Sequence, residues 1–307
     1  MTIKIFGHKY PDTDSTGSPI LWAWYLNNVQ NIPAEPRLIG TPNTEATFML
    51  KHWGLAQPAQ LEHLNANDPV VIVDTNNPAE LPKNINDTAI KAIIDHHKLV
   101  GGIKTKVPID IIIRPLACTA TIMIDLMKAK TLAQMPCEIK GAALSCILSD
   151  TMEFRSPTTT VHDRAVAKQL AADLEISIPD YAAQMFAAKS DISAFSDAEL
   201  LRMDSKEFTV DELKLRVSVL ETTSPAEVLA RQTSLLQTMP IVAKQDGVDQ
   251  VLLFIVDILN TESTLLIPNA TVKAIAETSF AVPVSGASVV LPGVVSRKKQ
   301  ILPQLKT

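Results

Sequence analysis

The chain has 307 residues, of which 46% are hydrophobic and 20% charged, and its formal net charge at pH 7 is −5. This length allows a large core and favours two domains, while the negative charge and the lack of a long apolar run argue against nucleic acid or a membrane as partner. Three cysteines without CxxC spacing, and an N-terminus without a signal peptide, indicate reduced thiols in a cytoplasmic protein rather than a disulfide framework or structural zinc.

The first strand-like run, residues 3–6, is followed by a cluster of ionisable side chains. Residues 7–15 contain His8, Asp12 and Asp14. An open α/β sheet has its active crevice at the carboxyl ends of its strands, where this cluster would lie. Carboxylates this close in sequence repel one another unless a cation neutralises them, and the simplest candidate is a divalent metal.

Three later apolar segments also end in acid or histidine. They are residues 69–73, 92–94 and 142–148, and the ionisable residues at their far ends are Asp74, Asp95, His96, His97 and Asp150. A single aspartate after a strand is often only the N-cap of the next helix. Four such segments in one chain are better explained by a metal centre.

The order of the elements predicts an α/β fold. Residues 1 to about 187 alternate strand-like and helix-like segments, which is typical of a mostly parallel sheet flanked by helices. The expected helices are residues 15–28, capped by Ser15, then 44–53, 119–128, 158–174 and 178–189.

A polar segment rich in Ser and Asp, residues 189–196, is the expected linker. It would separate a first domain, residues 1–188, from a smaller mixed α/β domain, residues 197–307. In the second domain we expect strands over residues 213–220, 250–259, 264–267 and 287–296 and helices over 225–238 and 269–278.

The acid and imidazole side chains indicate more than one metal ion. The candidate ligands are His8, Asp12, Asp14, Asp74, His96 and Asp150. Mixed imidazole and carboxylate ligands suit Mn²⁺, Co²⁺, Fe²⁺ or Zn²⁺ better than Ca²⁺. They are too many for one ion that keeps an open position, so two ions that share a carboxylate fit better. Two ions roughly 3.5–4 Å apart can hold a bridging hydroxide that attacks phosphorus in an in-line displacement.

The apolar segment near the C-terminus ends in three consecutive cations, in the sequence Ser296-Arg297-Lys298-Lys299. A solvated basic tail is one explanation. In a chain with an acidic metal cluster a phosphate clamp is the better one, since Arg binds phosphate through two hydrogen bonds and Lys acts as a point charge. Lys206 is a further candidate that the sequence does not distinguish from a surface lysine.

These motifs together resemble a known family. Asp95-His96-His97 after an apolar strand, with His8-x-x-x-Asp12-x-Asp14, resembles the DHH phosphoesterase superfamily. The finer resemblance is to the family II, manganese-dependent inorganic pyrophosphatases. Its motifs span nearly the whole chain and are residues 7–15, 73–74, 95–97, 115–121, 149–151 and 296–299.

The resemblance implies hydrolysis of pyrophosphate, a phosphoanhydride, to two phosphates at a two-metal site between the domains. The fold would be a DHH domain followed by a DHHA2-like domain. One metal would be held by His8, Asp12 and Asp74, and the second by Asp14, Asp74, His96 and Asp150, so that Asp74 bridges them.

The resemblance also implies the roles of the remaining residues. His97 would be the general acid, Asp95 would orient the neighbouring histidines, and the cations Lys206, Arg297 and Lys298 would bind pyrophosphate. Mn²⁺ or Co²⁺ would occupy the two protein sites and Mg²⁺ would arrive with the substrate. The expected assembly is a cytoplasmic homodimer paired through the N-terminal domain.

One segment departs from the family pattern. After the metal-binding aspartate the family usually carries His-Asn-Glu, whereas this chain has Thr75-Asn76-Asn77. This difference leaves the metal preference open but not the reaction class. There is no spare block of roughly 120 residues, the size of a domain, between His97 and the linker, so an inserted regulatory domain is not expected.

Two alternatives stand beside this interpretation. The first is a DHH-type phosphodiesterase or exonuclease that acts on oligonucleotides or cyclic dinucleotides. Such an enzyme would need a glycine-rich motif and aromatic platforms for bases, but the expected second domain, residues 197–307, has only Phe208, Phe254 and Phe280 as aromatic residues. The second is a metal-loaded binding module without turnover, which is disfavoured because every ligand and the acid are present.

Overall fold

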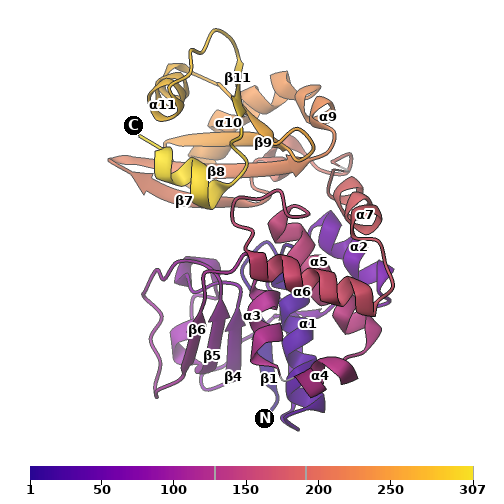
Figure 1. Cartoon of the computed structure of the whole chain (residues 1–307). Coiled ribbons are helices and arrows are strands. Elements are labelled where there is room, and N and C mark those ends of the chain that lie inside the picture. The colour runs from indigo at the N-terminus through magenta and orange to yellow at the C-terminus, as the bar shows by residue number, and fades with distance from the viewer. Residues whose placement is uncertain (128, 191, 307) are drawn as a thin grey trace. The chain divides into compact units, whose positions relative to one another are not determined.

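The computed structural model describes residues 1–127, 129–190 and 192–306, and the chain forms two compact units, Met1–Met185 and Phe186–Thr307 (Figure 1). Helix α7 (Ile178–Ser190) contains the boundary between them. Three predicted positions lie outside the described residues: Lys128 in the predicted helix 119–128, Asp191 in the predicted linker, and Thr307 at the end of the predicted second domain.

The first unit contains a six-stranded, all-parallel sheet, which confirms the predicted fold class. Its spatial order is β3-β2-β1-β4-β5-β6, and Figure 1 shows β4, β5 and β6 side by side. The strands are β1 (Ile3–Phe6), β2 (Ala34–Leu38), β3 (Ala59–Gln60), β4 (Pro69–Val73), β5 (Ala89–Asp95) and β6 (Asp110–Ile113). Every residue of β4 is buried, as expected for a parallel strand covered on both faces.

Helices cover this sheet, and short 3₁₀ turns interrupt its loops. The helices are α1 (Thr13–Asn28), α2 (Thr44–His52), α3 (Thr119–Leu126), α4 (Ala129–Gln134), α5 (Cys137–Thr151), α6 (Val161–Asp173) and α7, and the turns are Pro78–Glu80 and Ile85–Asp87. The apolar segment 142–148 lies in α5, which is buried on nearly all sides and therefore shows no polar face.

Two predicted helix starts are wrong. The N-cap of α1 is Asp12, whose side chain accepts the Ser15 backbone N–H at 2.9 Å, so the predicted cap Ser15 lies inside the first turn. Helix α6 begins at Val161 rather than 158, because Thr160 and Asp163 form a capping box there.

The second unit is built on a mixed five-stranded sheet of order β11-β10-β9-β8-β7, as predicted for a mixed α/β domain. In the part of this unit that the structure describes, β8 and β9 pair in parallel and the other neighbouring strands are antiparallel. The strands are β7 (Ser205–Val210), β8 (Leu213–Thr222), β9 (Gln250–Asp257), β10 (Glu262–Leu266) and β11 (Ser288–Pro292). The helices are α8 (Asp197–Leu200), α9 (Pro225–Leu229), α10 (Gln232–Asp246) and α11 (Ala270–Phe280), followed by a π-helical turn Arg297–Ile301 and a 3₁₀ turn Leu302–Gln304.

The helix predicted over residues 225–238 is two helices. Arg231 lies between α9 and α10 with non-helical backbone angles. Its guanidinium donates to Asp197 Oδ1 at 2.5 and 2.9 Å and to the Phe195 carbonyl at 2.8 Å. These contacts stabilise the non-helical conformation of Arg231 between α9 and α10. Among the described residues, no helix is both long enough and apolar enough to cross a bilayer.

Candidate metal centre

The candidate centre lies where the strand order of the first sheet reverses. Strands β2 and β3 continue from one side of β1, and β4 pairs with its other side. The carboxyl ends at such a switch point form the usual crevice of an open α/β sheet. His8 follows β1 and Asp74 follows β4, so this topology brings both residues to the crevice.

The turn that carries His8 depends on a glycine. The His8 backbone N–H donates to Ser15 Oγ at 2.8 Å. A Cβ at Gly7 would lie 1.9 Å from that oxygen, closer than any real contact. Only glycine therefore allows the chain to approach the first turn of α1 this closely. Asp12 and Asp14 lie at the same end of α1.

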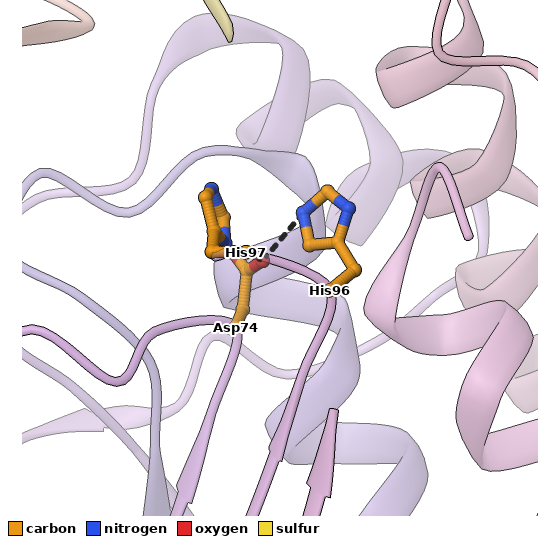
Figure 2. A group of neighbouring side chains, drawn as sticks. All are labelled: Asp74, His96 and His97. Carbon is orange, nitrogen blue, oxygen red and sulfur yellow. Dashed lines mark ion pairs between the residues drawn. The ribbon is translucent and has the colours of Figure 1, made fainter. Parts of the chain in front are cut away.

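Asp74 lies at the middle of the site and is only 1% exposed. Its Oδ2 lies 3.4 Å from His8 Nε2, and its Oδ1 lies 3.3 Å from His96 Nε2. Figure 2 shows the Asp74 carboxylate directed toward the rings of His96 and His97. Asp74 has φ of 57°, a conformation that aspartate tolerates better than most residues and that turns the chain out of β4. Its two oxygens thus face different histidines.

Three groups of side chains in the described chain have ligand atoms within 4.8 Å of one another and could hold a metal ion. They are His8, Asp12 and Asp74; Asp14, His96 and Asp150; and Asp74, His96 and His97. All six predicted ligands belong to these groups, although they come from residues 8 to 150 of the chain. Two groups share Asp74 and two share His96, which is the pattern expected of adjacent ions.

The carboxylates of the site are electrostatically strained without a cation. Burial, followed by the charges of Asp14 and Asp12, raises the pKa of Asp74. The same causes raise the pKa of Asp150, whose Oδ2 is buried without a hydrogen-bond partner in the described structure. A buried carboxylate oxygen without a donor is costly unless it binds a cation. The donor set therefore fits one or more divalent metals.

Thr119, at the start of α3, contacts two of these carboxylates. Its backbone N–H donates to Asp14 Oδ2 at 2.7 Å, and its hydroxyl donates to Asp74 Oδ1 at 3.2 Å. Ser18 donates to the other oxygen of Asp14 at 2.5 Å. Thr119 lies in the motif 115–121 but is not among the predicted site residues. A helix N-terminus favours anions because its backbone N–H groups are unpaired, and the predicted helix start at residue 119 could have indicated this contact.

Asp95, which is buried, and His97, which is partly exposed, form a pair beside the centre. Asp95 Oδ1 lies 2.8 Å from His97 Nδ1 and accepts the His97 backbone N–H at 3.0 Å, while Asn76 donates to Oδ2 at 2.5 Å. Burial alone would raise the pKa of Asp95, but the hydrogen bond and charge of His97 outweigh it and lower the pKa. The ring of His96 is oriented differently, with Nδ1 3.3 Å from the Leu116 carbonyl. The contacts of Asp95 thus hold the His97 ring in place.

Thr75 occupies the position at which the resembled family usually carries a histidine. It is 1% exposed, and its hydroxyl donates to Glu80 Oε2 at 2.7 Å. The next residue, Asn76, links Asp95 to the following loop through the Lys98 carbonyl and the Val100 N–H. Thr75 and Asn76 therefore both form hydrogen bonds beside the centre, although the segment differs from the family pattern.

The three predicted phosphate-binding cations belong to the second unit. Lys206 lies on β7, and Arg297 and Lys298 lie in the π-helical turn. Arg297 donates from Nη1 to the Asp204 carbonyl at 2.5 Å and from Nη2 to Asp204 Oδ1 at 2.7 Å. This contact brings the C-terminal turn next to the start of β7, so residues 206 and 297 are carried by neighbouring segments.

Comparison with known proteins agrees with this geometry. Residues 2–149 match the DHH family, N-terminal domain, and residues 183–307 match the DHHA2 domain. The chain is 37% identical to a probable manganese-dependent inorganic pyrophosphatase of Deinococcus radiodurans, over 99% of this chain and 98% of that protein. A protein of Shouchella clausii with the same description is 35% identical over 98% of this chain and 96% of its own length.

Solved structures show the same relationship. A putative family II inorganic pyrophosphatase of Methanococcus jannaschii superposes with a TM-score of 0.84 at 32% identity, over 98% of both chains. An exopolyphosphatase-related protein of Bacteroides fragilis has a TM-score of 0.51 at 13% identity, over 98% of this chain and 89% of its own, and shares the fold alone. With its DHH and DHHA2 domains and its near full-length relatives, the chain belongs to the family II, manganese-dependent inorganic pyrophosphatases.

Proposed function

We propose that this protein hydrolyses inorganic pyrophosphate to two phosphates at a two-metal centre bridged by Asp74. The observation that carries the proposal is the arrangement of Asp74, whose two carboxylate oxygens face His8 and His96 respectively. The names of the relatives support the substrate and the use of manganese. We also propose the division into a catalytic domain, residues 1–188, a linker, 189–196, and a substrate-binding domain, 197–307.

In this proposal His8, Asp12 and Asp74 hold one ion, and Asp14, Asp74, His96 and Asp150 hold the other. The tautomers of the histidines support these roles. His8 Nδ1 lies 2.7 Å from the Lys9 carbonyl and His96 Nδ1 3.3 Å from the Leu116 carbonyl, so both rings carry the proton on Nδ1 and leave Nε2 as the ligand atom. When bound, Mn²⁺ or Co²⁺ would lower the pKa of water and neutralise charge on the phosphoryl oxygens.

His97 is proposed as the general acid for the leaving phosphate. Its Nδ1 is held by Asp95, which leaves Nε2 as the atom that would deliver the proton. The lowered pKa of Asp95 keeps that carboxylate ionised, and an ionised neighbour favours the protonated imidazole. The His97 side chain is 29% exposed, so substrate could reach it.

Lys206, Arg297 and Lys298 are proposed to bind the pyrophosphate, with Mg²⁺ arriving as part of the substrate. The guanidinium of Arg297 has five N–H donors, of which Asp204 takes two. The remaining donors would be available to a phosphate oxygen, and Lys would add point charge. Nucleic acid is not proposed as a partner.

A cytoplasmic homodimer, paired through the first unit, completes the proposal. Strand β6 is the last strand of the six-stranded sheet. Ile111 on this strand is 55% exposed, and Val107 just before it is also exposed. An edge strand with exposed apolar side chains is a surface that another chain commonly covers.

The test is a side-by-side hydrolysis assay. Protein stripped with EDTA and reloaded with Mn²⁺, Co²⁺ or Mg²⁺ is given pyrophosphate, and phosphate release is measured. A short oligonucleotide and a cyclic dinucleotide are assayed in parallel. We expect release from pyrophosphate that depends on Mn²⁺ or Co²⁺. Turnover of the oligonucleotide without turnover of pyrophosphate would contradict the proposal.

A further inference from the structure

We propose that Glu45, which is outside the predicted ligand set, is a positioning residue for the metal centre. Its carboxylate would join α1 to α5 at the points where these helices carry metal ligands. The inference rests on the metal site proposed above. Glu45 lies in the first turn of α2 and is 0% exposed. Glutamate is almost never fully buried without partners that stabilise it.

Glu45 accepts hydrogen bonds from two hydroxyl groups that are distant from each other in sequence. Its Oε2 accepts from Thr13 Oγ1 at 2.8 Å and from Ser149 Oγ at 2.5 Å. Thr13 lies between Asp12 and Asp14, and Ser149 immediately precedes Asp150. Glu45 Oε2 thus connects Thr13, at the start of α1, with Ser149, near the end of α5.

The chemistry of these contacts requires an acceptor at this position. Both partners donate an O–H to the same oxygen, and a carboxylate oxygen has two lone pairs with which to accept both. Hydrogen bonds depend on direction as well as distance, whereas apolar packing has no direction. The contacts therefore fix the two backbone segments with more precision than apolar packing does.

The approach of the two helices has a separate cause. A Cβ at Gly17 on α1 would lie 2.4 Å from Cys146 Sγ on α5, so the helices already touch at this glycine. This contact sets how near the helices come. How Asp14 and Asp150 meet depends also on the rotation and sliding of each helix, and a ligand atom of each lies within 4.8 Å of the other. The Glu45 contacts restrain that rotation at the level of the ligands.

The attachment of α2 to α5 does not rely on Glu45. At the other end of α2, Trp53 Nε1 donates to the Tyr181 hydroxyl at 2.6 Å, and that hydroxyl lies 2.6 Å from Ser145 Oγ on α5. Burial raises the pKa of Tyr181 to about 12, so the hydroxyl keeps its proton. Tyr181 itself lies on α7, and Trp53 Nε1 also lies 3.2 Å from Ser145 Oγ directly. A substitution of Tyr181 would therefore remove buried hydrogen bonds to the end of α2 and to α5 without touching a residue next to a ligand.

The experiment compares Glu45→Ala and Glu45→Gln with the matched control Tyr181→Phe in the full chain. Metal-free protein is titrated with Mn²⁺ by calorimetry, the electron paramagnetic resonance spectrum of the bound ions is recorded, and Tm is measured without metal. We expect Glu45→Ala to weaken Mn²⁺ binding by about 10-fold. This is the lower end of the range of about 10–100-fold for removing a direct partner of a metal ligand, because Glu45 contacts the neighbours of the ligands. Glu45→Gln keeps an acceptor oxygen and should lose less. Tyr181→Phe should lower Tm with unchanged Mn²⁺ affinity.

The outcomes separate the inference from the proposed function. If the wild-type chain does not bind Mn²⁺, the proposed metal site itself is wrong. If it binds Mn²⁺ and Glu45→Ala lowers only Tm, as the control does, Glu45 has a purely structural role and the inference is overturned. Should Glu45→Ala fail to fold, Ser149→Ala and Thr13→Val each remove one contact and leave the carboxylate. Wild-type Mn²⁺ affinity in both would also overturn the inference.

Discussion

If Asp74 bridges two metal ions, the substitution Asp74→Ala should remove the stabilisation that both ions give to the folded chain. Both oxygens of Asp74 face candidate metal ligands, so this one substitution removes a ligand from each site. Each ion present at 100 times its Kd stabilises the folded chain by about 2.7 kcal/mol, so two ions contribute about 5 kcal/mol. For a unit that ends at Met185, about 1 kcal/mol corresponds to about 2–4 °C in Tm.

Mn²⁺ should therefore raise the Tm of the wild-type chain by about 10–20 °C. In Asp74→Ala we expect almost none of this increase. In His8→Ala, which removes a ligand from one group only, about half should persist. The Tm of the metal-free variant should not fall for electrostatic reasons, because the negative charges of Asp14 and Asp12 already disfavour an ionised Asp74.

The assay is differential scanning calorimetry of EDTA-treated protein with and without Mn²⁺, combined with elemental analysis of the bound metal. The two variants serve as controls for each other, since both lose a ligand beside the same strand ends. If Asp74→Ala keeps as much metal and as much of the Tm increase as His8→Ala does, Asp74 does not bridge two ions. The two-metal assignment would then have to be abandoned.

Three further predictions concern the acid, the cations and pH. His97→Ala should lower kcat by roughly 10²–10⁴ if His97 is the general acid, whereas a change confined to KM in steady-state assays would make it a binding residue. Lys298→Ala should raise KM while Mn²⁺ content stays at the wild-type level, and unchanged kinetics would assign Lys298 to the solvated surface. Because Asp74 and Asp150 have pKa values raised above the ordinary value of about 3.9, the folded metal-free chain binds more protons than the unfolded chain above that pH. Its urea midpoint should therefore fall as pH rises through the raised pKa values, and Mn²⁺ should remove this dependence. Asp95 has a lowered pKa, so its contribution to stability is lost only in acid. A urea midpoint that rises from pH 5 to 8 in EDTA would therefore contradict the raised pKa values of Asp74 and Asp150.

Much of the first unit follows from local sequence patterns. The buried run 69–73 and the apolar segment before Asp95 are strands β4 and β5, and residues 44–53 closely match α2. Periodicity and capping act over a few residues, so they can be read without knowledge of the fold. The rule that parallel strands present their carboxyl ends at one edge then places Asp74 and His96 together.

Other features depend on contacts that no local pattern encodes. The strand order that places β1 beside β4 brings His8 within 3.4 Å of Asp74. Thr119 and Asp14 are separated by 105 residues, and Ser149 and Glu45 by 104. Such pairs form because helices and sheet pack in one particular arrangement. Their members look like ordinary polar residues in the sequence.

The amino-acid sequence by itself determined the parallel sheet, the identities of the candidate ligands and the family to which the chain belongs, because these depend on short-range periodicity and on residue types at fixed spacings. Only the tertiary structure decided that Asp12 rather than Ser15 caps α1, that the His97 ring pairs with Asp95, and that Glu45 contacts Thr13 and Ser149 beside the ligands. Hydrogen-bond geometry in a buried site is set by the packing of distant segments, and that packing exists only in the folded chain.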